Sequence, residues 1–124
     1  MENSLLTPLE LKVMNILWGL KQAFVKEIIA EWPDEPVPAY NTVSTIVRIL
    51  EKKGYISHKA FGRSHQYLPV RTKGEYQKLL IRNVVDNVFS GSASGLVSSL
   101  LDQDSLSKQE LLSLKELIDQ SDSA

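Results

Sequence analysis

The stretch PAYNTVSTIVRILEKKGYISHKAFGRSHQYLP, residues 38–69, decides the fold because its periodicity changes halfway along. In its first half, apolar residues recur at helical spacing and form one face, Val43, Ile46, Val47, Ile49 and Leu50. In its second half, two runs rich in Ile, Tyr and Val, residues 55–60 and 64–70, have the composition of strands. Gly62 lies between them and can supply the turn, with Arg63 at or beside its tip. We therefore expect a helix followed by a two-stranded hairpin.

The opposite face of the expected helix is polar in an unusual way. The residues on this face and at the helix N-terminus are Tyr40, Asn41, Thr42, Ser44, Thr45 and Arg48. A surface helix without a binding role is normally filled with Glu and Lys, whereas Asn, Thr, Ser and Arg carry groups that can read base edges in DNA. This face is the candidate recognition surface. Asn41 suits a bidentate pair with adenine, and Tyr40 either contacts phosphate or packs.

Positive charge is concentrated in the same region. The whole chain has 14 Lys and Arg against 15 Asp and Glu, a net charge of −1. Residues 40–73, by contrast, hold seven basic residues against one acid, Glu51, a net charge of +6. Both histidines, His58 and His65, also lie there. This asymmetry favours an anionic partner, with a merely solvated basic face as the alternative.

Two helices are expected upstream. Thr7, Pro8 and Glu10 form a capping-box pattern that predicts a helix in TPLELKVMNILWGL, and AFVKEIIAEWP predicts a second, shorter one. PDEPVP then places three prolines in six residues, which makes a stiff connector. Helix, helix, connector, polar-faced helix and hairpin is the order of a winged helix-turn-helix. Its second helix enters the major groove, and the arginine of the wing can reach phosphate or the minor groove.

Phosphate contacts are assigned to three basic side chains in and beside the hairpin. They are Lys59, Arg63 and Arg71. Together with the polar helix face they form the candidate DNA-binding surface.

The last third of the chain predicts three short helices, in residues 72–91, 92–103 and 105–120. They contain more Leu and Val than they can bury among themselves, so we expect them to pair with a second copy of the chain; the alternative is that they complete the core of the monomer. The candidate dimerisation residues are Leu80, Val84, Val88, Leu96, Leu100, Leu111, Leu114, Leu117 and Ile118. The expected class is mostly α (α+β), with a winged-helix DNA-binding domain at 1–71 and a helical dimerisation domain at 72–124.

Several functional classes are disfavoured. The sequence has no cysteine, which excludes disulfides and thiolate zinc sites. We expect no signal peptide and no membrane insertion, because no apolar run approaches the ~18 residues that span a bilayer. A cytoplasmic protein without cofactor or metal is expected. His58 and His65 have no carboxylates nearby in the sequence that suggest a catalytic or metal site, so we do not expect an enzyme.

Two other binding roles are alternatives to DNA binding. Winged helices also serve as protein–protein adaptors, but an adaptor should show apolar anchors across residues 40–48. RNA binding lacks a platform of stacking aromatic residues in this sequence.

Four segments resemble the penicillinase-repressor (BlaI/MecI/CopY) family of bacterial transcription repressors. They are TPLELKVMNILW, TVSTIVRILEKKGYI, GRSHQYLP and FSGSASGLVSSLLDQDSLSKQELLSLKELI. The resemblance implies a homodimer with an N-terminal winged helix and a C-terminal dimerisation domain, which binds dyad-symmetric operator DNA and blocks transcription. In antibiotic-responsive members, a membrane sensor metalloprotease triggers cleavage of the repressor and its release from DNA. The lack of cysteine separates this chain from the copper-responsive members.

The chain departs from the family pattern at two places. The bond cut in penicillinase repressors, an Asn-Phe bond, falls on Ser99-Leu100 here. Ile49 stands where family members often have an arginine. Thr42 and Thr45 match the family pattern, whereas Asn41, Ser44 and Arg48 stand at variable positions and should set the sequence preference of this protein.

Overall fold

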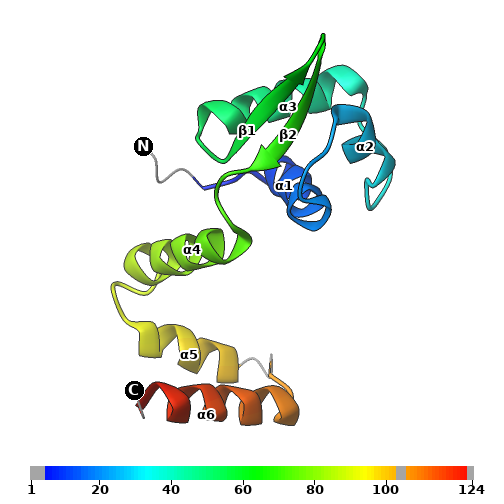
Figure 1. Cartoon of the computed structure of the whole chain (residues 1–124). Coiled ribbons are helices and arrows are strands. Elements are labelled where there is room, and N and C mark those ends of the chain that lie inside the picture. The colour runs from blue at the N-terminus through cyan, green and yellow to red at the C-terminus, as the bar shows by residue number, and fades with distance from the viewer. Residues whose placement is uncertain (1–4, 103–105, 123–124) are drawn as a thin grey trace. The chain divides into compact units, whose positions relative to one another are not determined.

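The computed structural model describes residues 5–102 and 106–122. It divides into two compact units, an N-terminal unit (residues 1–80) and a C-terminal unit (residues 81–124). The elements are α1 (Pro8–Leu20), α2 (Val25–Ala30), α3 (Tyr40–Lys52), β1 (Ile56–Phe61), β2 (Ser64–Pro69), α4 (Lys73–Asn87), α5 (Ala93–Asp102) and α6 (Lys108–Asp122) (Figure 1). The expected mostly α class with one two-stranded sheet is confirmed.

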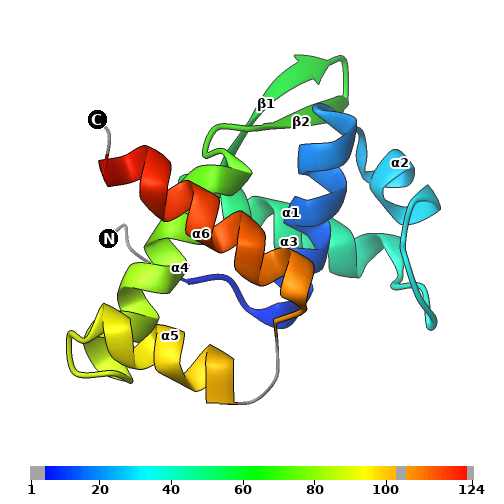
Figure 2. The ribbon, with the colours of Figure 1, turned by 90° about the horizontal axis from the view of Figure 1, so that it is seen from below.

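The helix α1 begins with the predicted capping box. The backbone N–H of Glu10 donates to Thr7 Oγ1 at 3.2 Å, and Glu10 Oε1 accepts from the Thr7 N–H at 2.9 Å. Val13, Met14 and Leu17 are fully buried along one side of this helix, which is the helical spacing that the sequence indicates. α1 packs against α3 and against β2, so it forms the base on which the candidate recognition helix rests (Figure 2).

The apolar side of α3 is narrower than expected. Val43, Val47 and Leu50 are fully buried and Ile46 nearly so, but Ile49 is 41% exposed. The expectation that Ile49 belongs to the apolar face was therefore wrong. At about 100° per residue, Ile49 lies about 110° around the helix from the centre of the buried arc. This isoleucine is on the side of α3 that carries the polar residues.

β1 and β2 form the predicted antiparallel hairpin. The register runs from Ile56 opposite Pro69 to Phe61 opposite Ser64, which leaves Gly62 and Arg63 as a two-residue loop. Gly62 has φ +62°, and of these two described residues it alone has a positive φ. A glycine with positive φ at the first loop position is typical of a type II′ turn. The turn therefore puts Arg63 at the tip of the wing, as predicted.

The hairpin is fixed to the helices through Tyr67. The N–H of Ala23 donates to the Tyr67 carbonyl at 2.9 Å, and the Tyr67 N–H donates to the Ala23 carbonyl at 2.8 Å. Ala23 lies in the connection between α1 and α2 and thus extends the sheet by one residue pair. The Tyr67 side chain is buried beneath the hairpin. The tip projects beyond the helices (Figure 1), while the base of the hairpin cannot move independently of them.

α4 starts within the N-terminal unit. Thr72 and Glu75 form the predicted capping box, and the buried Tyr76 accepts a hydrogen bond from the Leu6 N–H at 3.1 Å. This contact explains why the two compact units divide at residue 80, within α4, and not at its start. The functional division after residue 71 stays a prediction.

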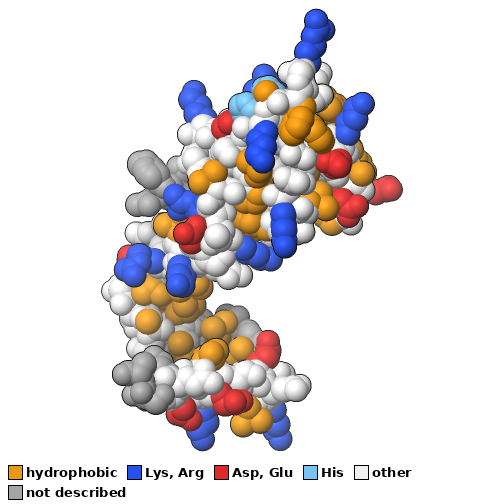
Figure 3. Space-filling view, in the orientation of Figure 1, with side chains coloured by type: hydrophobic (Ala, Val, Ile, Leu, Met, Phe, Trp, Pro, Cys, Tyr) orange, Lys and Arg blue, Asp and Glu red, His pale blue; other side chains and the backbone are white. Residues whose placement is uncertain are grey.

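Among the residues that the structure describes, the C-terminal unit has no buried core of its own. A third predicted capping box, Ser107 with Glu110, opens α6. None of the side chains described between residues 81 and 120 is fully buried, and Val88 and Leu117 are 70% and 62% exposed. Apolar side chains accordingly appear at the surface of this part in Figure 3. The side chain of Ile118 lies outside the described residues.

Among the described residues, no helix combines the length and the apolar character needed to cross a membrane.

Candidate nucleic-acid interface

The exposed side of α3 brings the predicted reading residues together. Asn41, Thr45, Arg48 and Lys52 recur at intervals of four, three and four residues, so they lie along one side of the helix, opposite the buried arc. All four are exposed to solvent. Thr42 also is exposed, beside this row. The surface is therefore formed by hydrogen-bonding groups and two cations.

The N-terminus of α3 is unlike those of α1, α4 and α6. Each of these begins with a capping box that holds a glutamate carboxylate at the first turn. α3 follows Ala39, has no side-chain cap, and has no acid in its first turn. The partial positive charge at the start of a helix attracts anions. The N-terminal end of α3 therefore suits a phosphate better than the capped ends of those other helices.

Two of the reading residues are hydrogen-bonded to their own helix. Thr45 Oγ1 donates to the Asn41 carbonyl at 2.9 Å. Arg48 Nε donates to the Ser44 carbonyl at 3.2 Å, and its Nη2 lies 3.4 Å from Ser44 Oγ. The Arg48 side chain thus lies back along the helix toward its N-terminus. The two contacts of Arg48 with Ser44 are long and exposed, so the guanidinium can leave them for a stronger acceptor.

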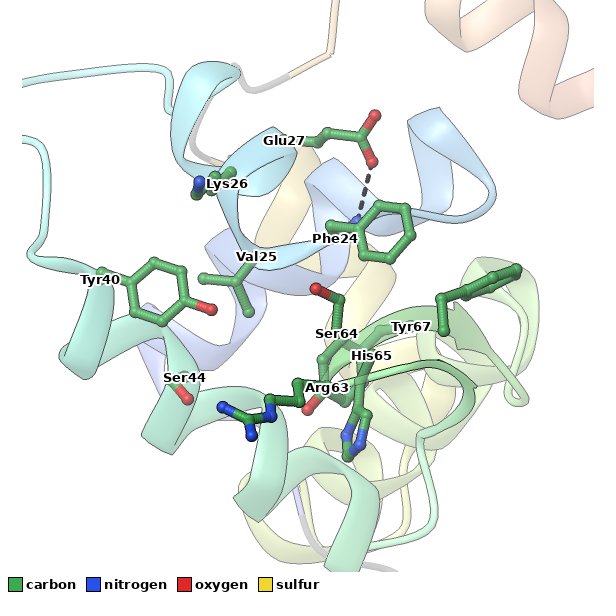
Figure 4. Close-up of a pocket in the computed structure, with 11 residues that line it drawn as sticks. Phe24, Val25, Lys26, Glu27, Tyr40, Ser44, Arg63, Ser64, His65 and Tyr67 are labelled. Atoms are coloured by element: carbon green, nitrogen blue, oxygen red, sulfur yellow. Dashed lines mark hydrogen bonds between the residues drawn. The ribbon is translucent and has the colours of Figure 1, made fainter.

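A groove of about 530 Å³ separates α3 from the hairpin tip. Tyr40 and Ser44 line it from α3, Lys26 from α2, and Arg63 and His65 from the wing. Figure 4 shows the Tyr40 hydroxyl, the Ser44 hydroxyl and the Arg63 guanidinium directed into the same space. One groove, lined also by the acid Glu27 and by the apolar side chains of Phe24, Val25 and Phe61, thus connects the start of the recognition helix with the tip of the wing.

Aromatic packing supports the wing beside this groove. The rings of Phe24 and Phe61 meet edge to face, with their centroids 5.7 Å apart. Phe24 begins the turn into α2 and Phe61 ends β1, so this pair braces the hairpin near its tip. Tyr67 forms part of the groove lining, and burial, followed by the charge of Glu51, raises the pKa of its hydroxyl. Tyr67 is therefore a neutral hydrogen-bonding group in the groove wall.

The two histidines join the hairpin to the C-terminal half of α3. The rings of His58 and His65 are stacked, with centroids 4.1 Å apart and planes 8° apart. His58 Nδ1 lies 2.7 Å from Glu51 Oε2. No carboxylate is near the histidines in the sequence, and Glu51 reaches His58 because the hairpin folds back against α3. No three acidic or histidine side chains in the described parts of the chain are arranged to hold a metal ion.

Lys59 and Arg71 are not part of the groove. Lys59 alternates with His58 along β1 and so points from the opposite face of the hairpin. Arg71 follows β2 at the base of the hairpin, where its guanidinium carbon lies 5.0 Å from the Tyr55 ring centroid and its carbonyl accepts from Trp18 Nε1 at 2.9 Å. The structure therefore brings Arg63, but neither of these two, close to the N-terminal end of α3. Their phosphate contacts stay predictions.

Lys26, Lys52 and His65 are additional candidates that were not identified from the sequence. Lys26 lies on α2, and only the packing of α2 beside α3 brings it to the groove. Lys52 continues the row of reading residues by one helical turn, a position that the spacing alone could have indicated. On the face shown in Figure 3, cationic side chains project from the hairpin beside the histidines, while acidic side chains gather on the α2 side.

A buried ion pair fixes the far end of α3. Lys53 Nζ donates to Glu10 Oε1 at 2.8 Å, and Glu10 is only 6% exposed. Burial alone raises the pKa of Glu10, but the hydrogen bond from Lys53 and the one from the Thr7 backbone outweigh it and hold this pKa below its ordinary value. The carboxylate that caps α1 therefore also ties α1 to the end of the recognition helix.

Comparison with known proteins assigns the fold and the family. The family model described as Penicillinase repressor matches residues 6–120. The methicillin resistance regulatory protein MecI of Staphylococcus aureus is 28% identical over 109 residues, which cover 88% of this chain and 89% of that protein. The penicillinase repressor of Bacillus licheniformis is 25% identical over 90% of this chain and 87% of its own length.

The solved structures include a match to the winged helix. The solution structure of the DNA binding domain of the repressor BlaI aligns with a TM-score of 0.50 and 28% identity, covering 57% of this chain and 87% of that domain. The resemblance seen in the sequence is thereby confirmed. The chain belongs to the penicillinase repressor family, a family of DNA-binding transcriptional repressors.

Proposed function

We propose that this protein is a homodimeric repressor that binds dyad-symmetric operator DNA through α3 and the hairpin and blocks transcription by occupying the site. The observation that supports this function most directly is the exposed side of α3. Asn41, Thr45 and Arg48 present hydrogen-bonding groups there, next to a helix N-terminus that carries neither an acid nor a side-chain cap. A helix-turn-helix reads the major groove with this part of its second helix.

The exposed side of α3 is assigned to base reading. The groove between α3 and the hairpin tip, together with the wing, is assigned to phosphate contacts that position the protein on DNA. Asn41 is suited to adenine, and such a bidentate pair gives roughly 1–3 kcal/mol of discrimination against the wrong base. Thr42 and Thr45 contact bases or phosphates beside Asn41. The Arg48 guanidinium reaches the major groove of the DNA after it leaves Ser44. Arg63 binds phosphate from the wing tip. Contacts to the backbone fix register and orientation and carry no sequence information.

Further contacts to the DNA backbone come from the other residues around the groove and the hairpin. The exposed Tyr40 hydroxyl and the Lys26 ammonium group line the same groove as Arg63 and suit the same phosphate strand. Lys59 and Arg71 are assigned to phosphates further from the tip.

Dimerisation is assigned to the C-terminal unit. Its candidate residues are exposed or half-buried in the single chain; the described ones are Val84, Val88, Leu96, Leu100, Leu111, Leu114 and Leu117. Leu80, which was also predicted to contribute, belongs to the N-terminal unit and packs against its core. A second copy that covers these side chains supplies the core that this unit lacks. Two winged helices held in this way can read two half-sites, one helical turn or a multiple of it apart.

Release from DNA is assigned to cleavage at Ser99-Leu100 after activation by a membrane sensor metalloprotease. This bond lies inside α5, so a protease can cut it only after the helix opens locally. α5 contains Gly95, Ser98 and Ser99, residue types with weaker helix propensity than alanine or leucine, which makes opening easier. A cut there separates α6 from the rest of the chain and removes part of the dimer surface.

The test of this function is a selection of bound fragments from the host genome by the purified protein at near-physiological salt, where non-specific binding is weak. We expect a dyad-symmetric motif upstream of a small number of genes. The double variant Asn41→Ala, Arg48→Ala, which keeps the fold because both residues are exposed, should lose this enrichment. If the folded wild-type dimer enriches no motif, operator binding is wrong and a protein-adaptor role takes its place.

A further inference from the structure

Ile49 is an apolar side chain on the reading side of α3. It is 41% exposed, and it follows Thr45 by one helical turn and Arg48 by one residue. Between Asn41 and Lys52, all of which the structure describes, every other large aliphatic side chain of α3 is buried in the core. Ile49 contributes little to that core, so packing does not account for an isoleucine at this position.

The neighbours of Ile49 favour a nucleic acid over an apolar protein surface. Thr45 and Lys53 lie one turn away on either side, and Arg48 and Lys52 lie beside them. An apolar partner that covered Ile49 would also remove the exposed cations of Arg48 and Lys52 from water, at a high desolvation cost, whereas Lys53 is already paired with Glu10. An anionic duplex interacts favourably with Arg48 and Lys52. The partner must therefore combine negative charge with a small apolar group within reach of α3.

The major groove of DNA offers one such group. Among the base edges exposed there, the 5-methyl of thymine is the apolar one, and the other groups are hydrogen-bond donors and acceptors. Thr45 adds to this match, because its hydroxyl donates to the Asn41 carbonyl and in that arrangement can only accept a hydrogen bond from a base. The surface around Thr45 and Ile49 therefore suits a methyl group better than an acceptor.

We propose that Ile49 is a specificity-determining residue that reads a thymine in each operator half-site through its 5-methyl group. This inference rests on the proposed operator binding and adds a second reading position to it. Ile49 lies eight residues after Asn41, about 12 Å along the helix axis, which corresponds to about 3.5 base-pair steps of 3.4 Å. The thymine is thus a different base pair from the one read by Asn41.

The test replaces single thymines of the selected operator with deoxyuracil, which retains every hydrogen-bonding group and loses only the methyl. Binding of the full-length protein is measured by fluorescence anisotropy at fixed salt. For the wild type, we expect one symmetric position at which the replacement weakens binding about 4-fold per half-site, as for one buried methyl group, and roughly 16-fold when both half-sites are changed. In Ile49→Ala, the same replacement should have no effect, while replacements at other thymines keep theirs.

Two controls make the result specific. Ile49→Val retains a branched side chain and should keep a reduced response to the methyl, and Val37→Ala removes exposed apolar surface from the connector and should respond like the wild type. Circular dichroism verifies that the variants are folded. If specific binding is present but no deoxyuracil position depends on Ile49, the inference is overturned and the repressor function stands. If the wild type has no specific site, both are overturned.

Discussion

The two units of this chain place their apolar residues in opposite ways. The N-terminal unit buries Val13, Met14, Leu17, Val43, Val47 and Leu50 completely. The C-terminal unit has helices of similar length, but none of its described side chains is fully buried. A unit that closes its own core can present a fixed polar surface to a ligand, whereas a unit without one is stabilised by association. This difference is the basis on which we assign DNA reading to the N-terminal unit and dimerisation to the C-terminal unit.

Charging the exposed apolar face of the C-terminal unit should have the largest effect. In Val88→Asp, Leu117→Asp, two carboxylates would be buried in the proposed dimer, so we expect a monomer in sedimentation analysis. Operator affinity should fall by about 100-fold or more, because the second half-site is no longer bound intramolecularly. The matched control is Leu20→Asp, which charges an equally apolar exposed position of the N-terminal unit. It should remain a dimer; if both variants dissociate, or neither does, the division of roles is wrong.

Asn41→Ala should have the next largest effect. It should change only the sequence preference of the protein. We expect loss of roughly 1–3 kcal/mol at one base position per half-site, with the dimer unchanged. The measurement is a set of affinities for operators altered at each position. Thr42→Ala, at the neighbouring exposed position, is the comparison variant and should alter a different position or only overall affinity. An unchanged profile in Asn41→Ala would refute the adenine contact.

Local signals explain why so much of the N-terminal unit was predictable. The capping boxes of α1 and α4 depend on residues three apart, and the wing turn depends on Gly62, so each can be recognised within one short segment. Repeated spacing likewise identified the exposed side of α3.

Contacts between distant segments could not be predicted in the same way. The approach of Glu51 to His58, the position of Lys26 at the groove and the stacking of Arg71 on Tyr55 all depend on how elements pack. Ile49 was misplaced for a related reason: its spacing fits the edge of an apolar face, and only the packing of α1 and α2 on α3 decides how wide that face is.

The Glu10–Lys53 pair gives a smaller effect, confined to the stability of the N-terminal unit. The pKa of Glu10 is lower in the folded protein than its ordinary value of 4.5. The unfolded chain therefore binds the proton first as the pH falls, and the contribution of this carboxylate is complete above pH 4.5 and is lost below it, as the pH falls through the lowered pKa.

Glu10→Gln should reduce the free energy of unfolding by roughly 1–3 kcal/mol at pH 7 and flatten its decline as the pH falls from 7 to below 4.5. Urea titrations across this range measure both quantities. Glu27→Gln, which removes an exposed capping carboxylate from α2, controls for the loss of one charge. A decline as steep in Glu10→Gln as in the wild type would show that another group causes the acid sensitivity.

Arg63→Ala should have the smallest effect on operator affinity at physiological salt. Its effect should be recognised most clearly in the salt dependence of binding. The side chain projects from the tip of the wing into a groove of hydrogen-bonding groups, where a phosphate contact adds affinity without sequence preference. Each lost contact should reduce the slope of log affinity against log salt by about 0.9, so a dimer that loses two should change by about 1.8 while its preference among operator variants stays the same. Arg82→Ala, an exposed arginine of the C-terminal unit, should leave the slope unchanged. A change of preference in Arg63→Ala would instead place the wing tip against base edges, and the N-terminal unit would then read DNA with two elements and not with α3 alone.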